Sequence, residues 1–200
     1  MHGLVNRAIE RFVRDTYGRE VWIDTIRRLD LGYTEFEAML FYDPQITGRV
    51  LAAVAARLER GRDDLLEDIG TYLISNPQSD ALRRLLRFSG VDFVDFLHSL
   101  DDLPERTRLA VADLDLPPLE LTDHGEGRYC LHVGLPADHD LRFGPVMMGV
   151  LRAMADDYGA LVLMEYRGIS ESHEMIGIHL LEAAFTHGRA FDLGARGHLA

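Results

Sequence analysis

The sequence predicts an α+β domain, in which a helical first part is followed by an antiparallel sheet that one long helix interrupts. Apolar residues recur at helical spacing through the first half of the 200-residue chain. After Pro117-Pro118 the apolar residues instead alternate, or run together, over strand-length segments. The segments of this second part follow the order strand, strand, helix, strand, strand, which favours antiparallel pairing within one sheet.

The first part is expected to be a succession of helices joined by short turns. Residues 4–17 place apolar side chains on one face and arginines on the others, and Gly18 ends that helix. Asp43 and Pro44 mark a later helix start, because aspartate is a good N-cap and proline is tolerated at the first helical position. The predicted helices cover residues 4–17, 21–32, 44–61, 63–74, 79–88 and 91–103.

The second part is expected to contain four strands and one helix. The predicted strands cover residues 119–123, 128–134, 160–168 and 175–185, and the predicted helix covers 144–158. We expect residues 1–187 to form a single domain and residues 188–200 to form a loose C-terminal tail.

Composition argues against several classes of protein. The formal net charge of -12 disfavours nucleic acid as a partner, because phosphate backbones attract basic surfaces. No stretch approaches the roughly 20 consecutive apolar residues of a membrane helix, and the N-terminus lacks the apolar core of a signal peptide. The single cysteine, Cys130, cannot form an internal disulfide, which suits a reducing compartment. We therefore expect a soluble, cytoplasmic protein.

Motifs for catalysis and metal binding are missing from the sequence. No serine lies in a nucleophile-elbow pattern, and no glycine-rich phosphate loop is present. The nine histidines show none of the spacings typical of metal sites, and His132 with His139 is more simply explained by a solvated loop. We expect neither an enzyme nor a metal centre.

Several segments, in their order along the chain, resemble the heme–nitric oxide/oxygen binding (H-NOX) family, which includes the sensory domain of soluble guanylate cyclase. These segments are MHGLVNRAIERFV, GREVW, FYDPQITGRVLAAVAARL, DDLLEDIGTYLI and LLRFSGVDFVDFLHSLDDL, followed by Pro117-Pro118. The resemblance extends over roughly residues 1–187. It implies an N-terminal helical lobe and a sheet-containing lobe that hold heme between them, and sensory signalling to a partner protein.

The residues that hold heme in that family are replaced here. The family's axial histidine follows two acidic residues and an aliphatic one, and the matching position is Pro104, which has no donor atom for iron. In the family's tyrosine-x-serine-x-arginine signature for the heme propionates, Tyr129 is kept, but Leu131 and Val133 replace the serine and the arginine. The side chains of Leu131 and Val133 cannot bind a carboxylate by charge-assisted hydrogen bonds.

The resemblance also implies positions for the pocket wall and for substitute ligands of the iron. Val5 and Ile9 correspond to the distal wall, and Leu97 is a further candidate for the cavity wall. Pro117 and Pro118 are candidate cofactor-binding residues. His98 is the first alternative axial ligand to test. It lies six residues before Pro104, on the predicted helix 91–103, which corresponds to the helix that carries the axial ligand in the family. Cys130 and His132 are further alternatives, although a buried thiol and a hydrogen-bonded histidine are their simpler interpretations.

Two functional hypotheses follow from the resemblance together with these departures. In the first, a stand-alone sensory domain acts in trans on a kinase or a cyclic-nucleotide enzyme and uses its pocket for an apolar or tetrapyrrole-like ligand, without conventional histidine-ligated heme. In the second, heme with an unconventional axial ligand senses nitric oxide, since Val5 and Ile9 offer no hydrogen-bond donor for bound oxygen. In either case we expect the segment from Ser99 to Asp115 to be a movable element that contacts the partner.

Overall fold

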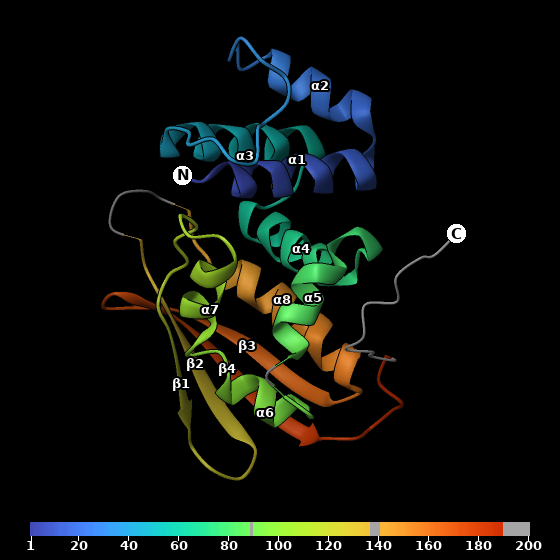
Figure 1. Cartoon of the computed structure of the whole chain (residues 1–200), viewed down its shortest axis with the longest axis vertical. Helices are drawn as coiled ribbons and strands as arrows, with labels where there is room; N and C mark the ends of the chain where they lie inside the picture. Colours follow the sequence, from blue (N-terminus) through green and yellow to red (C-terminus); the bar gives the residue numbers. More distant parts are fainter. Residues whose placement is uncertain (89, 137–140, 190–200) are drawn as a thin grey trace.

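The computed structural model describes residues 1–88, 90–136 and 141–189, and its two lobes lie one above the other (Figure 1). The upper lobe holds α1 (Gly3–Tyr17), α2 (Arg19–Arg27), α3 (Pro44–Leu58) and the start of α4 (Arg62–Ser75). The lower lobe holds the 3₁₀ helix η1 (Pro77–Ser79), α5 (Asp80–Arg87), α6 (Phe93–His98), α7 (Leu103–Ala110), α8 (Gly144–Tyr158) and the sheet.

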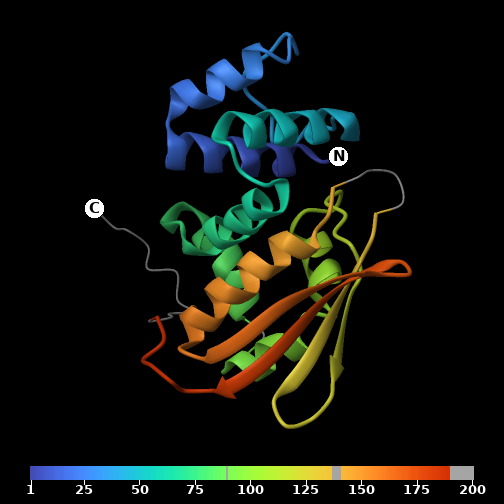
Figure 2. The same ribbon diagram turned by 180° about the vertical axis from the view of Figure 1, so that it is seen from behind.

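The sheet has the strand order β1-β2-β4-β3, and all of its neighbouring strands are antiparallel. Its strands are β1 (Leu119–Asp123), β2 (Arg128–Gly134), β3 (Leu161–Ser170) and β4 (His173–Glu182). Leu131 of β2 lies opposite Leu121 and Ile176, so apolar side chains of adjacent strands meet on one face. Helices α6, α7 and α8 lie against the sheet (Figures 1 and 2). The predicted α+β class with an antiparallel sheet and one long helix is confirmed.

Two glycines allow the helices of the two lobes to pack closely. A Cβ atom at Gly70 of α4 would lie 2.0 Å from the Val146 carbonyl oxygen, and one at Gly149 of α8 would lie 2.0 Å from the Glu67 carbonyl oxygen. Real Cβ atoms do not approach backbone this closely, so a larger residue at either position would push α4 and α8 apart. The position of the upper lobe over the lower one therefore depends on these two glycines.

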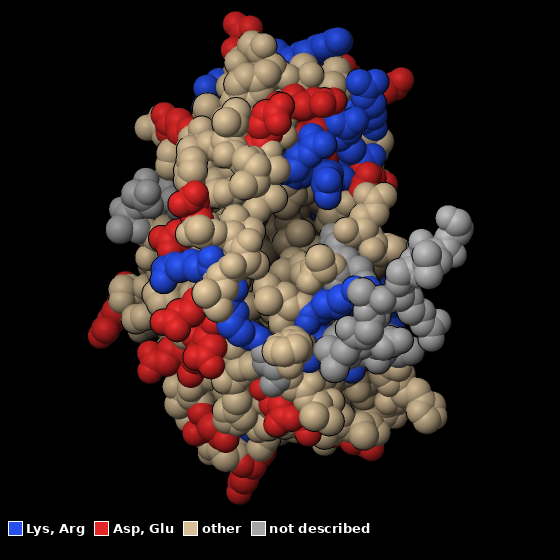
Figure 3. Space-filling view, in the orientation of Figure 1, with Lys and Arg blue, Asp and Glu red and all other residues tan. Residues whose placement is uncertain are grey.

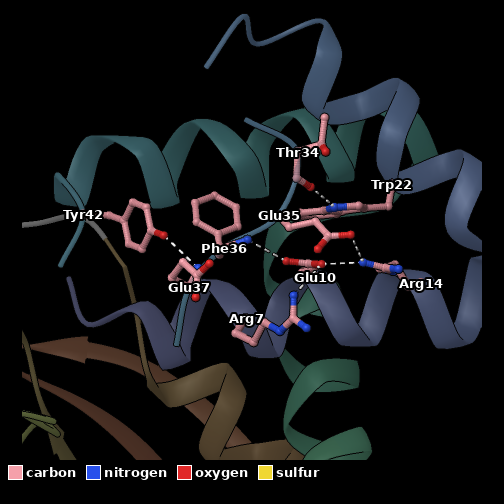
Figure 4. Close-up of polar contacts among 9 residues, drawn as sticks. All are labelled: Arg7, Glu10, Arg14, Trp22, Thr34, Glu35, Phe36, Glu37 and Tyr42. Atoms are coloured by element: carbon pink, nitrogen blue, oxygen red, sulfur yellow. Dashed lines mark hydrogen bonds and ion pairs between the residues drawn. The ribbon is translucent and has the colours of Figure 1, made fainter. Parts of the chain in front are cut away.

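A buried carboxylate fastens the loop between α2 and α3 onto α1 (Figure 4). Glu10 is fully buried and accepts hydrogen bonds from Arg7 (2.9 Å), from Arg14 (2.7 Å) and from the Phe36 N–H (2.9 Å). The Trp22 indole N–H donates to the Thr34 carbonyl oxygen (2.8 Å). These bonds fix the path of the loop that continues to Phe41, beside the start of α1.

Several element boundaries differ from the sequence-based prediction. The helix predicted over residues 21–32 ends at Arg27, and the one predicted over 44–61 ends at Leu58. Residues 91–103 do not form one helix: α6 ends at His98, and a separate helix, α7, starts at Leu103 with Pro104 in its first turn. Proline lacks the N–H that a helix interior requires, so it suits the first turn of a new helix rather than the end of a longer one. The last strand ends at Glu182, short of the predicted residue 185.

The C-terminal end of α8 is held by a second buried charge cluster. Asp157 accepts a hydrogen bond from Arg83 (2.8 Å) and lies 3.4 Å from Arg87, and the Arg87 guanidinium stacks 3.9 Å from the centre of the Tyr158 ring. The Arg189 N–H donates to the Asp157 carbonyl oxygen (2.9 Å), so residues 188 and 189 of the predicted tail lie against α8. Residues 190–200 of that tail lie outside the described residues.

Candidate functional site

A cavity of 730 Å³ lies between the start of α1, the helix α7 and the segment that leads into β1. Pockets of about 300–1,000 Å³ are of the size that holds small organic ligands. The lining residues are Met1, His2, Val5, Phe41, Asp101, Pro104, Glu105, Arg108, Asp113, Leu114, Asp115, Leu116, Pro117, Pro118, Leu119, Leu135, Pro136 and Phe143.

The upper wall of the cavity is built by the N-terminal residues and the loop ending at Phe41. His2 and Phe41 pair as an isolated antiparallel bridge, and the Gly3 N–H donates to the Leu40 carbonyl oxygen (2.7 Å). Gly3 is required there, because a Cβ atom would lie 2.1 Å from the Glu37 carbonyl oxygen. The backbone therefore holds the upper wall in place independently of the side chains that face the cavity.

His2 is the one buried, titratable side chain of that wall. It is 5% exposed, and its Nδ1 accepts a hydrogen bond from the Leu4 N–H (3.2 Å), so it caps the start of α1. Its ring meets the Phe41 ring edge-on, with centroids 5.2 Å apart. No hydrogen bond joins Nε2 to any other described residue. Because Nδ1 is an acceptor, the proton of the neutral ring sits on Nε2, which is then a free donor.

The lower wall comes from α7 and the turn before it. Pro104 is buried in the first turn of α7, and Glu105 and Arg108 follow on the same helix. The Asp101 carboxylate accepts a hydrogen bond from the Leu121 N–H (2.8 Å), which ties this turn to β1. Arg108 pairs with Asp115 (2.7 Å) across the cavity rim.

Carboxylates outnumber cationic groups around the cavity. Asp101, Glu105 and Asp113 have no cationic partner in the described part of the chain. Among the described lining residues, Arg108 pairs with Asp115, and the positively charged Met1 amino group donates to the Tyr42 carbonyl oxygen (2.9 Å), so four carboxylates face two cationic groups. Acidic side chains also dominate the lower lobe on the face seen in Figure 3, whereas arginines gather on the right of the upper lobe. The site thus favours cations over anions.

The structure brings only some of the sequence-predicted site residues to this cavity. Val5, Pro104, Pro117 and Pro118 line it. The other predicted wall residues lie in the two cores instead: Ile9 in the upper core, and Leu97 and Tyr129 in the lower. Burial raises the pKa of the Tyr129 hydroxyl, and Asp123 and Asp92 raise it further.

The positions that match the serine and the arginine of the propionate-binding signature hold no polar group. Leu131 and Val133 are fully buried and belong to the lower core, together with Met147, Met148 and Leu151. Side chains therefore fill the space beside β2, and the cavity lies next to the prolines at the end of the sheet.

None of the substitute iron ligands considered from the sequence lines the cavity. His98 is exposed, and its ring packs edge-on against Tyr129 at 6.0 Å. It also lies on α6 rather than on the helix of Pro104, contrary to the prediction. Cys130 is buried on the opposite face of β2 from Tyr129, and burial raises the pKa of its thiol. His132 lies near His173, with ring centroids 6.1 Å apart.

Sequence reasoning missed His2 as a site residue. A histidine is a weak helix N-cap by residue type, and the pairing of His2 with Phe41 joins segments far apart in the chain. Within residues 1–88, 90–136 and 141–189, no three His, Cys, Asp or Glu side chains gather as metal ligands. His139 lies outside these ranges. Over the same ranges, no helix has the length and apolar character of a membrane span.

Comparison with known proteins gives a family and a fold. The model of the Haem-NO-binding family matches residues 2–166. Among curated proteins, soluble guanylate cyclases 89Db and 89Da of Drosophila melanogaster are 21% and 20% identical to this chain over 123 residues. The match includes 62% of this chain but only 18% of either cyclase, so the chain spans less than a fifth of their length.

Solved structures show the same fold at low sequence identity. An H-NOX protein from S. oneidensis superposes with a TM-score of 0.77 at 18% identity, over 92% of this chain and 97% of that one. An H-NOX protein from K. algicida gives a TM-score of 0.77 at 16% identity, over 91% of this chain and 97% of that one. The fold described above is therefore shared with those proteins.

Proposed function

Because the chain belongs to the Haem-NO-binding family, whose domains are sensory rather than catalytic, we propose that it is a sensory domain with its ligand pocket between the two lobes. The proposal adds that the pocket works without histidine-ligated heme and that the domain acts in trans on a signalling protein, a kinase or a cyclic-nucleotide enzyme. The observation that carries it is the 730 Å³ cavity, whose wall includes Val5, Pro104 and the Pro117-Pro118 pair.

The residues around the cavity do not fit an iron-bound heme. Pro104, at the family's axial position, has no side-chain donor atom for iron. Leu131 and Val133 are buried among apolar side chains and cannot pair with propionates. The unpaired carboxylates of Asp101 and Glu105 would repel propionates rather than hold them. We therefore assign heme no part in the function of this chain.

The helix α7 is the proposed relay between the pocket and the partner. Pro104, Glu105 and Arg108 line the cavity, while Leu109 on the same helix is 90% exposed. A ligand that moves the pocket side of α7 would therefore also move a large apolar side chain at the surface. This supports the expectation that the segment from Ser99 to Asp115 contacts the partner.

An absorption spectrum tests the proposal. The protein would be purified from cells supplied with heme precursor and then titrated with hemin, before and after addition of nitric oxide. We expect a colourless protein that takes up no stoichiometric hemin. A Soret band of one heme per chain that shifts with nitric oxide would overturn the proposal in favour of a nitric oxide sensor with an unconventional axial ligand. The variant Pro104→His, which restores a donor, tests whether residue 104 accounts for the difference.

A further inference from the structure

The chemistry of the cavity identifies the kind of ligand that it selects. We infer that the pocket binds an organic cation: an apolar body that carries a protonated amine at one end and a hydrogen-bond acceptor at the other. The carboxylates of α7 and the following segment select the amine, and the His2 Nε2–H recognises the acceptor. This inference rests on the proposed function, because it names the ligand class of the same pocket.

The charge preference comes from carboxylates that no cationic side chain neutralises. Asp101, Glu105 and Asp113 line the lower wall and rim, and none of them has a cationic partner in the described part of the chain. The cation of Arg108 is taken by Asp115. These carboxylates would repel a carboxylate ligand, whereas an ammonium group could pair with them.

The apolar body is matched by the rest of the lining. Val5, Phe41, Leu116, Leu135 and Phe143 contribute aliphatic and aromatic surface to the cavity. Aromatic faces favour a neighbouring ammonium group as well as an apolar ring. The lining therefore accepts an amphipathic molecule better than a small hydrated ion.

His2 supplies the second recognition point, from the opposite lobe. It is at least nine-tenths buried, it lines the cavity, and its Nδ1 is occupied by the Leu4 N–H. A histidine that ligates a metal commonly donates its other ring N–H to an acceptor, and here the other nitrogen is itself the acceptor. The ring is therefore set as a donor through Nε2 rather than as a metal ligand, and a donor that no protein atom engages favours a ligand with an acceptor atom.

Three probes that share one ring separate these two contributions. They are 2-(4-methoxyphenyl)ethylammonium, its 4-ethyl analogue, in which a methylene replaces the ether oxygen, and 3-(4-methoxyphenyl)propanoate. Isothermal calorimetry on the full chain would measure their affinities. We expect the methoxy amine to bind about tenfold or more tightly than the carboxylate, and roughly two- to tenfold more tightly than the ethyl amine. Added salt should weaken the preference for the amine.

Matched variants assign each preference to its residues. Glu105→Gln with Asp113→Asn should remove most of the preference for the amine over the carboxylate. Glu20→Gln with Asp24→Asn makes the same charge change on exposed positions of α2 and should leave that preference intact. Both double variants change only exposed residues, so each is expected to fold.

The His2 variants separate recognition from folding. His2→Asn keeps a good N-cap but removes the Nε2–H donor, so it should abolish the preference for methoxy over ethyl while the melting temperature stays close to that of the natural chain. His2→Ala removes the cap as well and should also lower the melting temperature.

Each result decides for or against the ligand class. Equal or tighter binding of the propanoate, no binding of any probe, or an unchanged methoxy preference in His2→Asn would overturn it. If the inference of an organic cation is wrong but the protein still does not bind hemin, the proposed function is unaffected. Stoichiometric hemin uptake would overturn the proposed function itself.

Discussion

Replacing Glu10 should destabilise the upper lobe by breaking the link between α1 and the loop of residues 34–37. The Glu10 carboxylate is fully buried and is the acceptor for Arg7, Arg14 and the buried Phe36 N–H (Figure 4). The hydrogen bond with Glu10 is the main cause that raises the pKa of the Arg14 guanidinium. Glu10→Ala removes all three bonds at once.

The structure sets the expected size of the effect. The Phe36 N–H would lose its acceptor in a buried position, which costs about 1–3 kcal/mol. The side chains of Arg7 and Arg14 are 30% and 26% exposed, so water can partly replace the carboxylate around them. The loss therefore falls below the full penalty for breaking a buried ion pair, and we expect about 2–4 kcal/mol in total. This corresponds to a drop in melting temperature of about 4–16 °C for a chain of this size.

Urea unfolding of three variants would measure this effect. Glu10→Gln keeps an acceptor for the Phe36 N–H and should lose less free energy of unfolding than Glu10→Ala. Glu35→Ala is the matched control, because Glu35 also bonds Arg14 (3.2 Å) but is 54% exposed, so its loss should stay within about 0.5 kcal/mol. If Glu10→Ala were as mild as Glu35→Ala, the assignment of Glu10 as the fastening of the loop would be wrong.

Three further predictions concern the packing of the lower lobe. Gly149→Ala should lower the free energy of unfolding by about 1–3 kcal/mol in urea, because its Cβ would press on the Glu67 carbonyl oxygen; greater stability, as helix propensity alone implies, would contradict the close packing of α4 and α8. Arg106→Ala should lower the free energy of unfolding by about 1–3 kcal/mol, because the partly buried guanidinium donates to two carbonyl oxygens (3.1 and 3.4 Å). Glu105→Ala, at an exposed position of the same helix, should change it by no more than about 0.5 kcal/mol. Equal effects of the two substitutions would contradict this structural role of Arg106. Burial raises the pKa of Tyr158 to about 12, so the folded chain holds this proton more tightly than the unfolded chain does. Stability should fall as the pH rises from about 10 towards 12. Tyr158→Phe should weaken that dependence in a pH series of melting temperatures without abolishing it, because burial also raises the pKa of Tyr166 to about 12.

Most elements of the fold could be predicted because their signals are local. The apolar spacing of α1, the Asp43-Pro44 start of α3 and the alternation in β2 each lie within a dozen or so residues, and the structure agrees with each. The break between α6 and α7 was missed because apolar residues continue at helical spacing through residues 91–103. In the structure Pro104 lies in the first turn of the next helix, where its missing N–H carries no penalty.

The site was less predictable because it depends on contacts between distant segments. The pairing of His2 with Phe41 and the approach of α7 to the N-terminus have no signature at the level of residue spacing. Family resemblance led to Val5 and Pro104, which line the cavity, but also to Leu97, which the lower core takes up entirely. The replaced heme-holding residues indicate which ligand contacts are missing from the pocket. The position of the cavity depends on how neighbouring side chains pack, which the sequence alone does not show.

The two groups of replaced heme-holding positions have different physical consequences. Leu131 and Val133 face the core of the lower lobe, where apolar side chains can close around them and remove any void. Pro104 instead lines the cavity beside Pro117 and Pro118, and these prolines constrain the backbone of its wall. Pro118 is further held by its carbonyl oxygen, which accepts from the Gly134 N–H (2.9 Å), and the bridge from His2 to Phe41 fixes the opposite wall. Side chains can fill a space whose walls are free to move inward, but walls fixed by backbone bonds resist collapse. The open volume therefore persists at the proline end of the sheet, beside the carboxylates and the buried His2 from which we infer its ligand preference.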